Sequence, residues 1–207
     1  MIAVVGGGIF GLTAALELRA RGHAVTVYEP GPIPHPLAES TDISKVVRMD
    51  YGADADYTAL GEAALAGWRA WNARWPRPLF HETGVTFLSR APMAPGGFEH
   101  DSFALLTGRG HPLERLDASA IAVRFPAYRA GALVDGYWNP RGGWAESGAV
   151  VVRLAGEARA AGVVFEERAI RRLDEIRADL TIVCAGSWVR WLLPELAASI
   201  RAIGQPV

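Results

Sequence analysis

The first thirty residues divide into apolar runs separated by glycine. Residues 2–5 (IAVV) form a β-branched run, which is typical of a parallel strand buried on both faces. Residues 9–22 (IFGLTAALELRARG) have helical spacing and end at a glycine, and residues 23–29 (HAVTVYE) again have strand character. A strand, a tight turn, a helix and a second strand within residues 1–29 predict the first half of a right-handed crossover unit.

The next region changes from an extended loop to a long helix. Residues 30–36 carry four prolines, which deny this segment a regular hydrogen-bond ladder. Residues 54–75 predict a helix whose N-cap is Asp54. We interpret the tryptophans of this helix as core residues rather than as a platform for a ligand. Its inward face is predicted from apolar positions three or four residues apart: Leu60, Ala64, Trp68, Trp71 and Trp75.

The rest of the chain contains shorter elements. Residues 82–90 alternate between apolar and polar types and predict a strand, whereas residues 102–110 and 116–128 predict short helices. Asp117 is expected to cap the second of these helices, and Pro126 to stop it. Residues 180–186 (LTIVCAG) predict a buried strand. A longer helix capped by Ser147 is expected to turn four apolar residues inward: Val150, Val151, Leu154 and Ala158.

Composition narrows the class of protein. Half of the 207 residues are hydrophobic and the net charge is −1, with both signs scattered, so no basic surface for nucleic acid or an anionic membrane is predicted. The one cysteine, Cys184, excludes an internal disulfide framework and fits a reducing compartment. The five histidines never occur at metal-ligand spacing, so we predict no metal site. The apolar N-terminus is too short and too glycine-broken for a membrane span, and we expect a cytoplasmic protein.

Three glycines in the first turn carry the candidate chemistry. Gly6 permits the sharp turn, Gly8 has no side chain to block a diphosphate, and Gly11 lets the helix pack tightly on the strand. The N–H groups at the helix start then face the diphosphate. Glu29, which ends the second strand, can accept hydrogen bonds from an adenosine ribose and disfavours a 2′-phosphate there. The motif indicates a dinucleotide but does not separate FAD from NAD.

Lys45 is the only lysine among 21 basic residues, and all the others are arginine. It lies in a small polar cluster, residues 40–48 (STDISKVVR). A genomic bias towards arginine would explain its rarity without any function. A compact point charge beside a reactive cofactor is the alternative, because lysine and arginine are not interchangeable in that role.

Several separate segments resemble one family. The glycine motif, residues 40–52 (STDISKVVRMDYG), the long helix, residues 79–88 (LFHETGVTFL), and the stretches from residues 136 and 178 resemble the monomeric sarcosine oxidase branch of the D-amino-acid-oxidase-like flavoproteins. These are FAD-dependent amine oxidases. A late strand that returns to the first domain, some 150 residues after the first crossover, also favours FAD over NAD.

The resemblance implies an α/β fold: a Rossmann-like FAD-binding domain with an incomplete antiparallel-sheet (α+β) substrate domain. We expect residues 1–84 and 141–197 to form the first domain, and residues 85–140 and 198–207 to form part of the second. Members of the family run to nearly twice this length, so we expect the rest of the substrate sheet to be missing here and the isolated chain to associate or aggregate.

The resemblance also assigns roles to residues. Lys45 would bring positive charge to the flavin, where it stabilises the reduced cofactor and the reduction of oxygen, and Arg48 would steer a substrate carboxylate. Some relatives carry histidine where Thr41 stands, so no acid–base role is assigned to Thr41. The expected cofactor-binding residues are Gly6, Gly8, Ile9, Phe10, Gly11, Glu29, Pro30, Ser40, Thr41, Ser44, Lys45, Val46, Ile170, Cys184, Ala185, Gly186 and Trp188.

The implied activity is FAD-dependent oxidation of the C–N bond of a small secondary amine or amino acid, such as sarcosine. A hydride equivalent would pass to flavin N5, the imine would hydrolyse, and oxygen would reoxidise the flavin to give hydrogen peroxide. Three alternatives stay open: an amine dehydrogenase of the same fold with another acceptor, a nucleotide-binding remnant without turnover, and an NAD-dependent dehydrogenase. The sequence makes no prediction about the oligomeric state.

Overall fold

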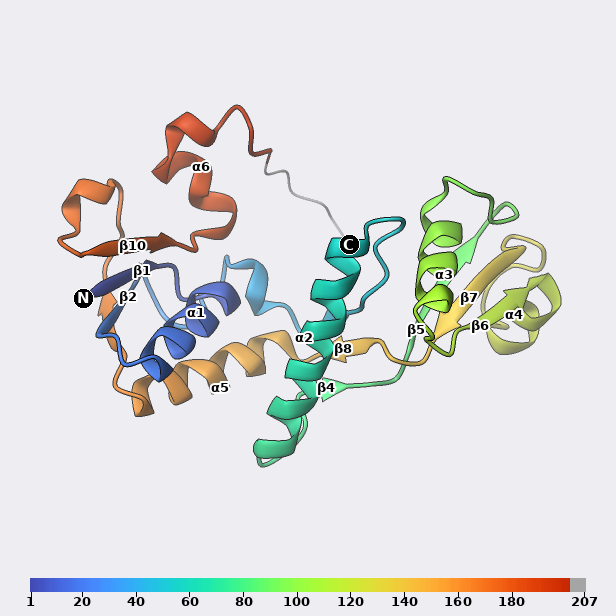
Figure 1. Cartoon of the computed structure of the whole chain (residues 1–207), viewed down its shortest axis with the longest axis horizontal. Coiled ribbons are helices and arrows are strands. Elements are labelled where there is room, and N and C mark those ends of the chain that lie inside the picture. The colour runs from blue at the N-terminus through green and yellow to red at the C-terminus, as the bar shows by residue number, and fades with distance from the viewer. Residues whose placement is uncertain (202–207) are drawn as a thin grey trace. The chain divides into compact units, whose positions relative to one another are not determined.

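The chain separates into two compact units in a computed structural model that describes residues 1–201 (Figure 1). The first unit comprises Met1–Ile43 and the chain from Glu146 onward, and the second comprises Ser44–Ala145. The expected boundaries after residues 84 and 140 fall inside the second unit, where they separate two sheets that share no strand pairing. The assignment of a cofactor domain and a substrate domain stays a prediction.

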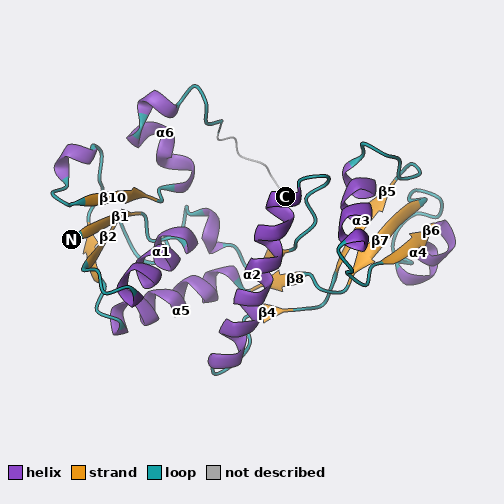
Figure 2. Ribbon diagram, viewed as in Figure 1, coloured by secondary structure: helices purple, strands orange, loops and turns teal. Residues whose placement is uncertain are grey.

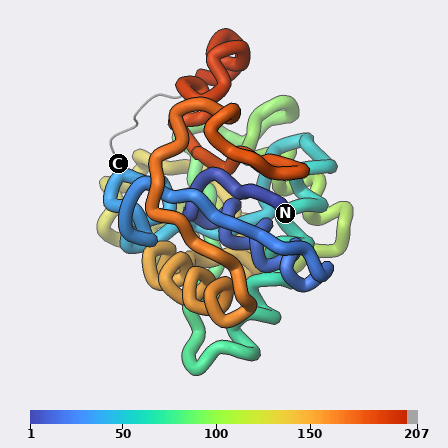
Figure 3. The backbone as a smooth tube through the Cα atoms, turned by 90° about the vertical axis from the view of Figure 1, so that its left-hand side faces the viewer, coloured from blue at the N-terminus to red at the C-terminus, as the bar shows by residue number. Residues whose placement is uncertain are grey.

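The first unit is built on a parallel sheet of four strands in the order β10-β1-β2-β9 (Figures 1 and 3). The predicted strand–turn–helix–strand unit is confirmed: β1, α1 and β2 follow one another, and Gly22 follows α1 with a positive φ of 86°. The helices and strands of this unit are β1 (Ile2–Val5), α1 (Ile9–Ala20), β2 (Val25–Glu29), α5 (Ser147–Ala160), β9 (Val164–Glu167), β10 (Leu180–Val183) and α6 (Val189–Leu192).

The core of this unit lies around β1, whose four residues are all buried between β2 and β10. Helices α1 and α5 pack against each other and lie together beside the sheet (Figures 1 and 3). The predicted inward face of α5 is confirmed, since its four apolar positions are at most 1% exposed. Burial of this helix pair holds the start of α1 at the carboxyl end of β1, the edge where nucleotides bind in such sheets.

Two predictions for the first unit are wrong. β10 is not a buried strand, because among the described residues it pairs on one side only, and Leu180 is 52% exposed. Ser147 is not the N-cap residue of α5. It is the first helical residue, and its hydroxyl donates to the carbonyl oxygen of Asp42 instead. Part of the expected substrate segment, residues 202–207, lies outside the described residues, and residues 198–201 belong to the first unit.

The second unit contains two small antiparallel sheets and three helices (Figure 2). One sheet has the order β3-β8-β4 and the other β5-β7-β6. The predicted caps hold, because Asp54 accepts from the N–H of Tyr57 and Asp117 accepts from the N–H of Ala120. The elements are β3 (Lys45–Val47), α2 (Ala55–Arg74), β4 (Phe80–His81), β5 (Val85–Ser89), α3 (Phe98–Gly108), β6 (Glu114–Asp117), α4 (Ala118–Arg124), β7 (Asp135–Asn139) and β8 (Gly143–Ala145).

The predicted inward face of α2 is partly wrong. Leu60 is 65% exposed and Ala64 is also exposed, whereas Thr58, Gly61 and Leu65 are buried. Gly61 explains this rotation of the helix: a Cβ there would lie 2.8 Å from the Cα of Met49, so the helix approaches the preceding segment by its smallest residue. The tryptophans of the last two turns pack mainly on one another and on Phe80, which supports their interpretation as core residues.

Candidate functional site

The turn between β1 and α1 has the close backbone contacts that its glycines predict. Gly6 has φ +112°, and a Cβ at this position would lie 2.3 Å from the carbonyl oxygen of Cys184. A Cβ on Gly11 would lie 1.8 Å from the carbonyl oxygen of Gly6. Both positions therefore require glycine so that β10, β1 and α1 can approach one another.

Gly8 differs from its neighbours, because a Cβ there would meet only the hydroxyl of Ser40, at 3.3 Å. The open side of the Gly8 backbone lies at the start of α1, where Ile9 donates its N–H to Ser40 Oγ at 3.2 Å. Phe10 is 78% exposed. The N–H groups of a first helical turn lack intrahelical acceptors, so this helix start can donate to a diphosphate.

Glu29 lies at the end of β2 and faces the same turn. Its Oε2 accepts the N–H of Gly7 at 2.6 Å, and burial raises the pKa of its carboxyl, against opposing effects from that hydrogen bond and from His35. The carboxylate retains a second oxygen for a ribose hydroxyl. Pro30, the next residue, is exposed.

The remaining predicted cofactor residues of the first unit follow its strands or lie in the loop after β2. Cys184, whose N–H donates to Val5 O at 2.7 Å, ends the β10 pairing, and burial raises the pKa of its thiol. Trp188, 40% exposed, meets His35 edge to face at a centroid distance of 6.1 Å. Ala185 and Ile170 are half-buried, Gly186 is exposed, and Thr41 donates its hydroxyl to the Ala38 carbonyl.

These residues fit an adenine dinucleotide cofactor. Gly8 offers a cradle that a side chain would fill, the N–H groups of Ile9 and Phe10 lie at a helix start, and Glu29 supplies a carboxylate at the adjacent strand end. In this arrangement backbone donors would hold the diphosphate and the acid would hold the ribose. Their roles in binding stay predictions.

Four of the predicted site residues belong to the second unit. Ser44 and Lys45 are exposed, and Lys45 pairs with Ala145 of β8 as the first residue of β3. Val46 is 64% exposed and pairs with Trp144. Strand β3 was not predicted, because three residues of mixed polarity give no periodic signal.

Arg48, the fourth of these residues, lies in a ring of aromatic side chains. Its guanidinium carbon lies 4.7 Å from the ring centre of Tyr51, 5.6 Å from that of Phe87 and 5.5 Å from that of Phe98. We call these three residues the Arg48 cage. One guanidinium nitrogen, Nη1, is buried and has no hydrogen-bond partner among the described residues. A buried charged donor without a partner costs free energy.

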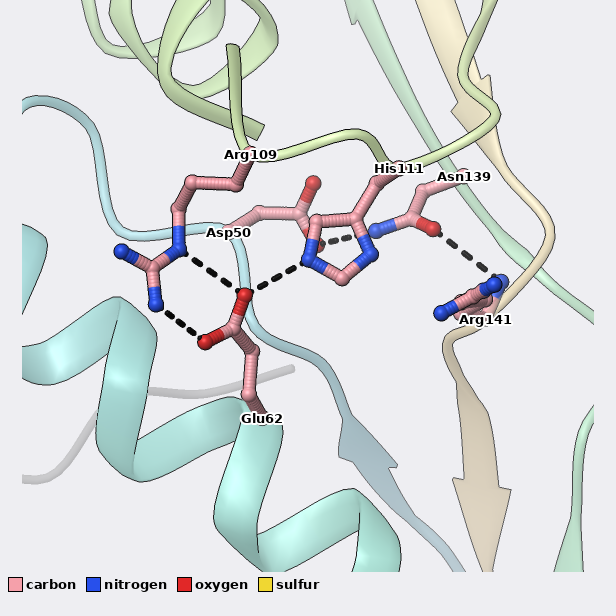
Figure 4. A network of polar contacts seen from close by, with 6 residues as sticks. All are labelled: Asp50, Glu62, Arg109, His111, Asn139 and Arg141. Atoms are coloured by element: carbon pink, nitrogen blue, oxygen red, sulfur yellow. Dashed lines mark hydrogen bonds and ion pairs between the residues drawn. The ribbon is translucent and has the colours of Figure 1, made fainter. Parts of the chain in front are cut away.

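Asp50 is a fully buried carboxylate that the sequence did not single out (Figure 4). Its two oxygens accept from Tyr137 Oη at 2.8 Å and from Asn139 Nδ2 at 3.0 Å. Burial raises the pKa of the Asp50 carboxyl, against the lowering effects of these hydrogen bonds and of the charge on Arg48. The only available signal was the alternation of Tyr137 and Asn139 on one face of β7.

A second polar cluster joins α2 to the segment after α3 (Figure 4). The carboxylate of Glu62 accepts from Arg109 Nε at 2.9 Å and contacts His111 Nε2 at 2.6 Å. The hydrogen bonds from Arg109 and His111 lower the pKa of Glu62 to about 2. This cluster ties two helices of the second unit together and has a structural role.

Residues 1–201 contain no helix that is long and apolar enough to cross a membrane. Within the same part of the chain, no group of three or more histidine, cysteine, aspartate or glutamate side chains is arranged to hold a metal ion.

Known proteins resemble this chain along its length. N-methyl-L-tryptophan oxidase of Salmonella arizonae is 27% identical over 213 residues, which cover 94% of this chain and 55% of that protein. L-saccharopine oxidase of Schizosaccharomyces pombe is 38% identical over 71 residues, or 33% of this chain and 16% of that protein. The chain thus spans about half the length of the first of these relatives.

Solved structures share the fold. NikD, an unusual amino acid oxidase essential for nikkomycin biosynthesis, matches 94% of this chain and 53% of its own, with a TM-score of 0.77 at 23% identity. Glycine oxidase from Geobacillus kaustophilus covers 95% of this chain and 58% of its own, with a TM-score of 0.77 at 18% identity. The predicted fold class, a parallel α/β sheet with antiparallel sheets, is confirmed. Residues 1–207 match the family model described as DAO, FAD dependent oxidoreductase, and the chain belongs to this family of FAD-dependent flavoproteins.

Proposed function

We propose that the full-length protein oxidises the C–N bond of a small secondary amine or amino acid that carries a carboxylate, with FAD as cofactor and oxygen as electron acceptor. The observation that carries this proposal is the buried, unpartnered Nη1 of Arg48 in a chain that also has the dinucleotide turn. N-methyl-L-tryptophan oxidase and L-saccharopine oxidase, which resemble this chain, are named for amino acid substrates.

In this proposal Arg48 binds the substrate carboxylate. The three rings of the Arg48 cage hold the guanidinium through cation–π contacts and exclude water from part of it. A carboxylate that reaches Nη1 gains a charge-assisted hydrogen bond and satisfies a donor that is otherwise buried without a partner. Such a bond contributes roughly 1.5–3 kcal/mol, which corresponds to a factor of about ten to a hundred in affinity.

The first unit holds the cofactor in this proposal. Gly8 and the N–H groups at the start of α1 bind the diphosphate, and Glu29 orients the adenosine ribose. When bound, FAD would accept the hydride that carries both electrons of amine oxidation. Lys45 supplies a positive charge that favours reduction of the cofactor and of oxygen, and no strong base is assigned to this chain.

The test uses purified full-length protein. We expect a flavin absorbance spectrum, bleaching of that spectrum by N-methylated or N-alkylated amino acids without air, and formation of hydrogen peroxide in air. Esters of the same amino acids should react poorly, and Arg48→Gln should remove the preference for the acids. Flavin bleaching without peroxide, restored by an artificial acceptor, would identify a dehydrogenase. A protein that binds no FAD would contradict the proposal.

A further inference from the structure

Asp50 is a buried charged group that interacts electrostatically with Arg48 and has no role in the proposed function. It is 0% exposed, yet its two hydrogen bonds come from the neutral side chains of Tyr137 and Asn139. Arg48 acts on it through charge alone, since no hydrogen bond joins the two side chains. A buried carboxylate is normally paired directly with a cation, because its desolvation costs several kcal/mol.

The hydrogen bonds of the second unit fix the position of this carboxylate. Tyr137 and Asn139 project from one face of β7 and occupy one Asp50 oxygen each. The side chain of Asn139 is fixed in turn, because its Oδ1 accepts the backbone N–H of Arg141 at 3.0 Å (Figure 4). The carboxylate is thus fixed where it acts electrostatically with Arg48, and Nη1 has no hydrogen-bond partner among the described residues.

We propose that Asp50 is a specificity-determining residue that sets the affinity of Arg48 for carboxylates. The ionised carboxylate of Asp50 offsets the charge of Arg48 and weakens anion binding. Protonation of Asp50 removes this offset and strengthens anion binding. This inference rests on the proposed role of Arg48 as the carboxylate anchor. The site then binds a monocarboxylate weakly enough to release it, whereas an uncompensated buried guanidinium would retain any anion.

Asp50 is the group beside Arg48 whose charge we expect to change with pH. From its own segment it faces the positively charged guanidinium of Arg48. From β7 it faces Tyr137, whose phenol pKa is raised by burial and by the neighbouring carboxylate. Glu62, which belongs to the other polar cluster drawn in Figure 4, stays ionised above a pKa of about 2. The pKa of Asp50 itself is raised by burial, so its protonation falls closer to neutrality than for an exposed aspartate.

The experiment measures binding of trifluoroacetate, a carboxylate that stays ionised throughout, by ¹⁹F NMR titration of full-length protein from mildly acidic to mildly alkaline pH. Wild type should bind more weakly as the pH rises, by about tenfold across the range. Asp50→Asn should bind about tenfold more tightly than wild type at the alkaline end and should lose the pH dependence. Arg48→Gln should bind none of the probe specifically.

The matched control is Asp135→Asn, which removes another buried carboxylate of β7 that pairs with Arg115. It should leave the affinity and its pH dependence unchanged. Weaker or unchanged binding in Asp50→Asn, or the same tightening in Asp135→Asn, would overturn the inference. If Asp50→Asn does not fold, the wild-type pH profile decides, and a flat profile rejects the role of Asp50. Equal binding of the probe by wild type and Arg48→Gln would instead contradict the proposed role of Arg48, and FAD binding should be unaffected in either case.

Discussion

The substitution Gly8→Ala should weaken cofactor binding strongly while changing the stability of the fold only slightly. The backbone of Gly8 has φ −77° and ψ −172°, a conformation open to any residue, and the added methyl would meet only Ser40 Oγ at 3.3 Å. The fold should therefore lose at most about 1 kcal/mol, the difference between glycine and alanine at an N-cap. The same methyl would occupy the space that a diphosphate needs against the backbone, so we expect FAD affinity to fall about a hundredfold, or about 2.7 kcal/mol.

Two neighbouring glycines supply controls for this prediction. At Gly11 a Cβ would lie 1.8 Å from Gly6 O, so Gly11→Ala should unfold the first unit or cost about 3 kcal/mol or more. At Gly156 in α5 no atom lies within 4 Å of the added Cβ, and Gly156→Ala should stabilise the protein by about 0.5–1 kcal/mol with FAD affinity unchanged. The assays are urea unfolding and titration of FAD fluorescence. Normal FAD affinity in Gly8→Ala would refute the placement of the diphosphate.

Three further outcomes are expected. Lys45→Met should retain FAD but slow its reoxidation by oxygen in stopped-flow measurements, and unchanged kinetics would leave Lys45 a structural residue of β3. Glu29→Gln should weaken FAD binding about tenfold and leave FMN binding unchanged, because FMN lacks the adenosine ribose. The hydrogen bond from Arg115 is the main cause that lowers the pKa of Asp135 to about 2. Asp135 therefore stabilises the fold above the unfolded pKa of about 3.9, and this contribution is lost as the pH falls towards 2. Because Arg115 is 44% exposed, the effect should be about 1–2 kcal/mol by urea unfolding, and Asp135→Asn should abolish that part of the pH dependence.

The first crossover unit could be predicted because its signals are local. The strand β1, the glycines at 6, 8 and 11 and the helix α1 follow one another within twenty residues, and backbone contacts require glycine at positions 6 and 11. Glu29 was found for the same reason, since it lies at a fixed place at the end of the next strand.

The second unit was harder to predict, because its short strands gain their stability from partners far along the chain. Lys45 pairs with Ala145, and neither three-residue strand has a period that a sequence window can detect. The rotation of α2 has a similar cause: Gly61 faces the backbone of Met49, and this tertiary contact overrides the apolar pattern that placed Leu60 inward.

The buried cluster around Asp50 shows why side chains that could recognise a ligand are hard to predict from sequence patterns. The dinucleotide turn is recognised through backbone atoms, so its glycine spacing is visible in the sequence. The proposed carboxylate anchor depends on side chains that only the folded second unit brings together, from residue 48 to residue 139. A core of apolar residues in place of Asp50, Tyr137 and Asn139 would fold at least as well, because buried polar networks rarely stabilise a fold more than hydrophobic packing does. What that replacement would remove is the fixed negative charge beside Arg48, and we infer that the cost of burying it is met by control of anion binding.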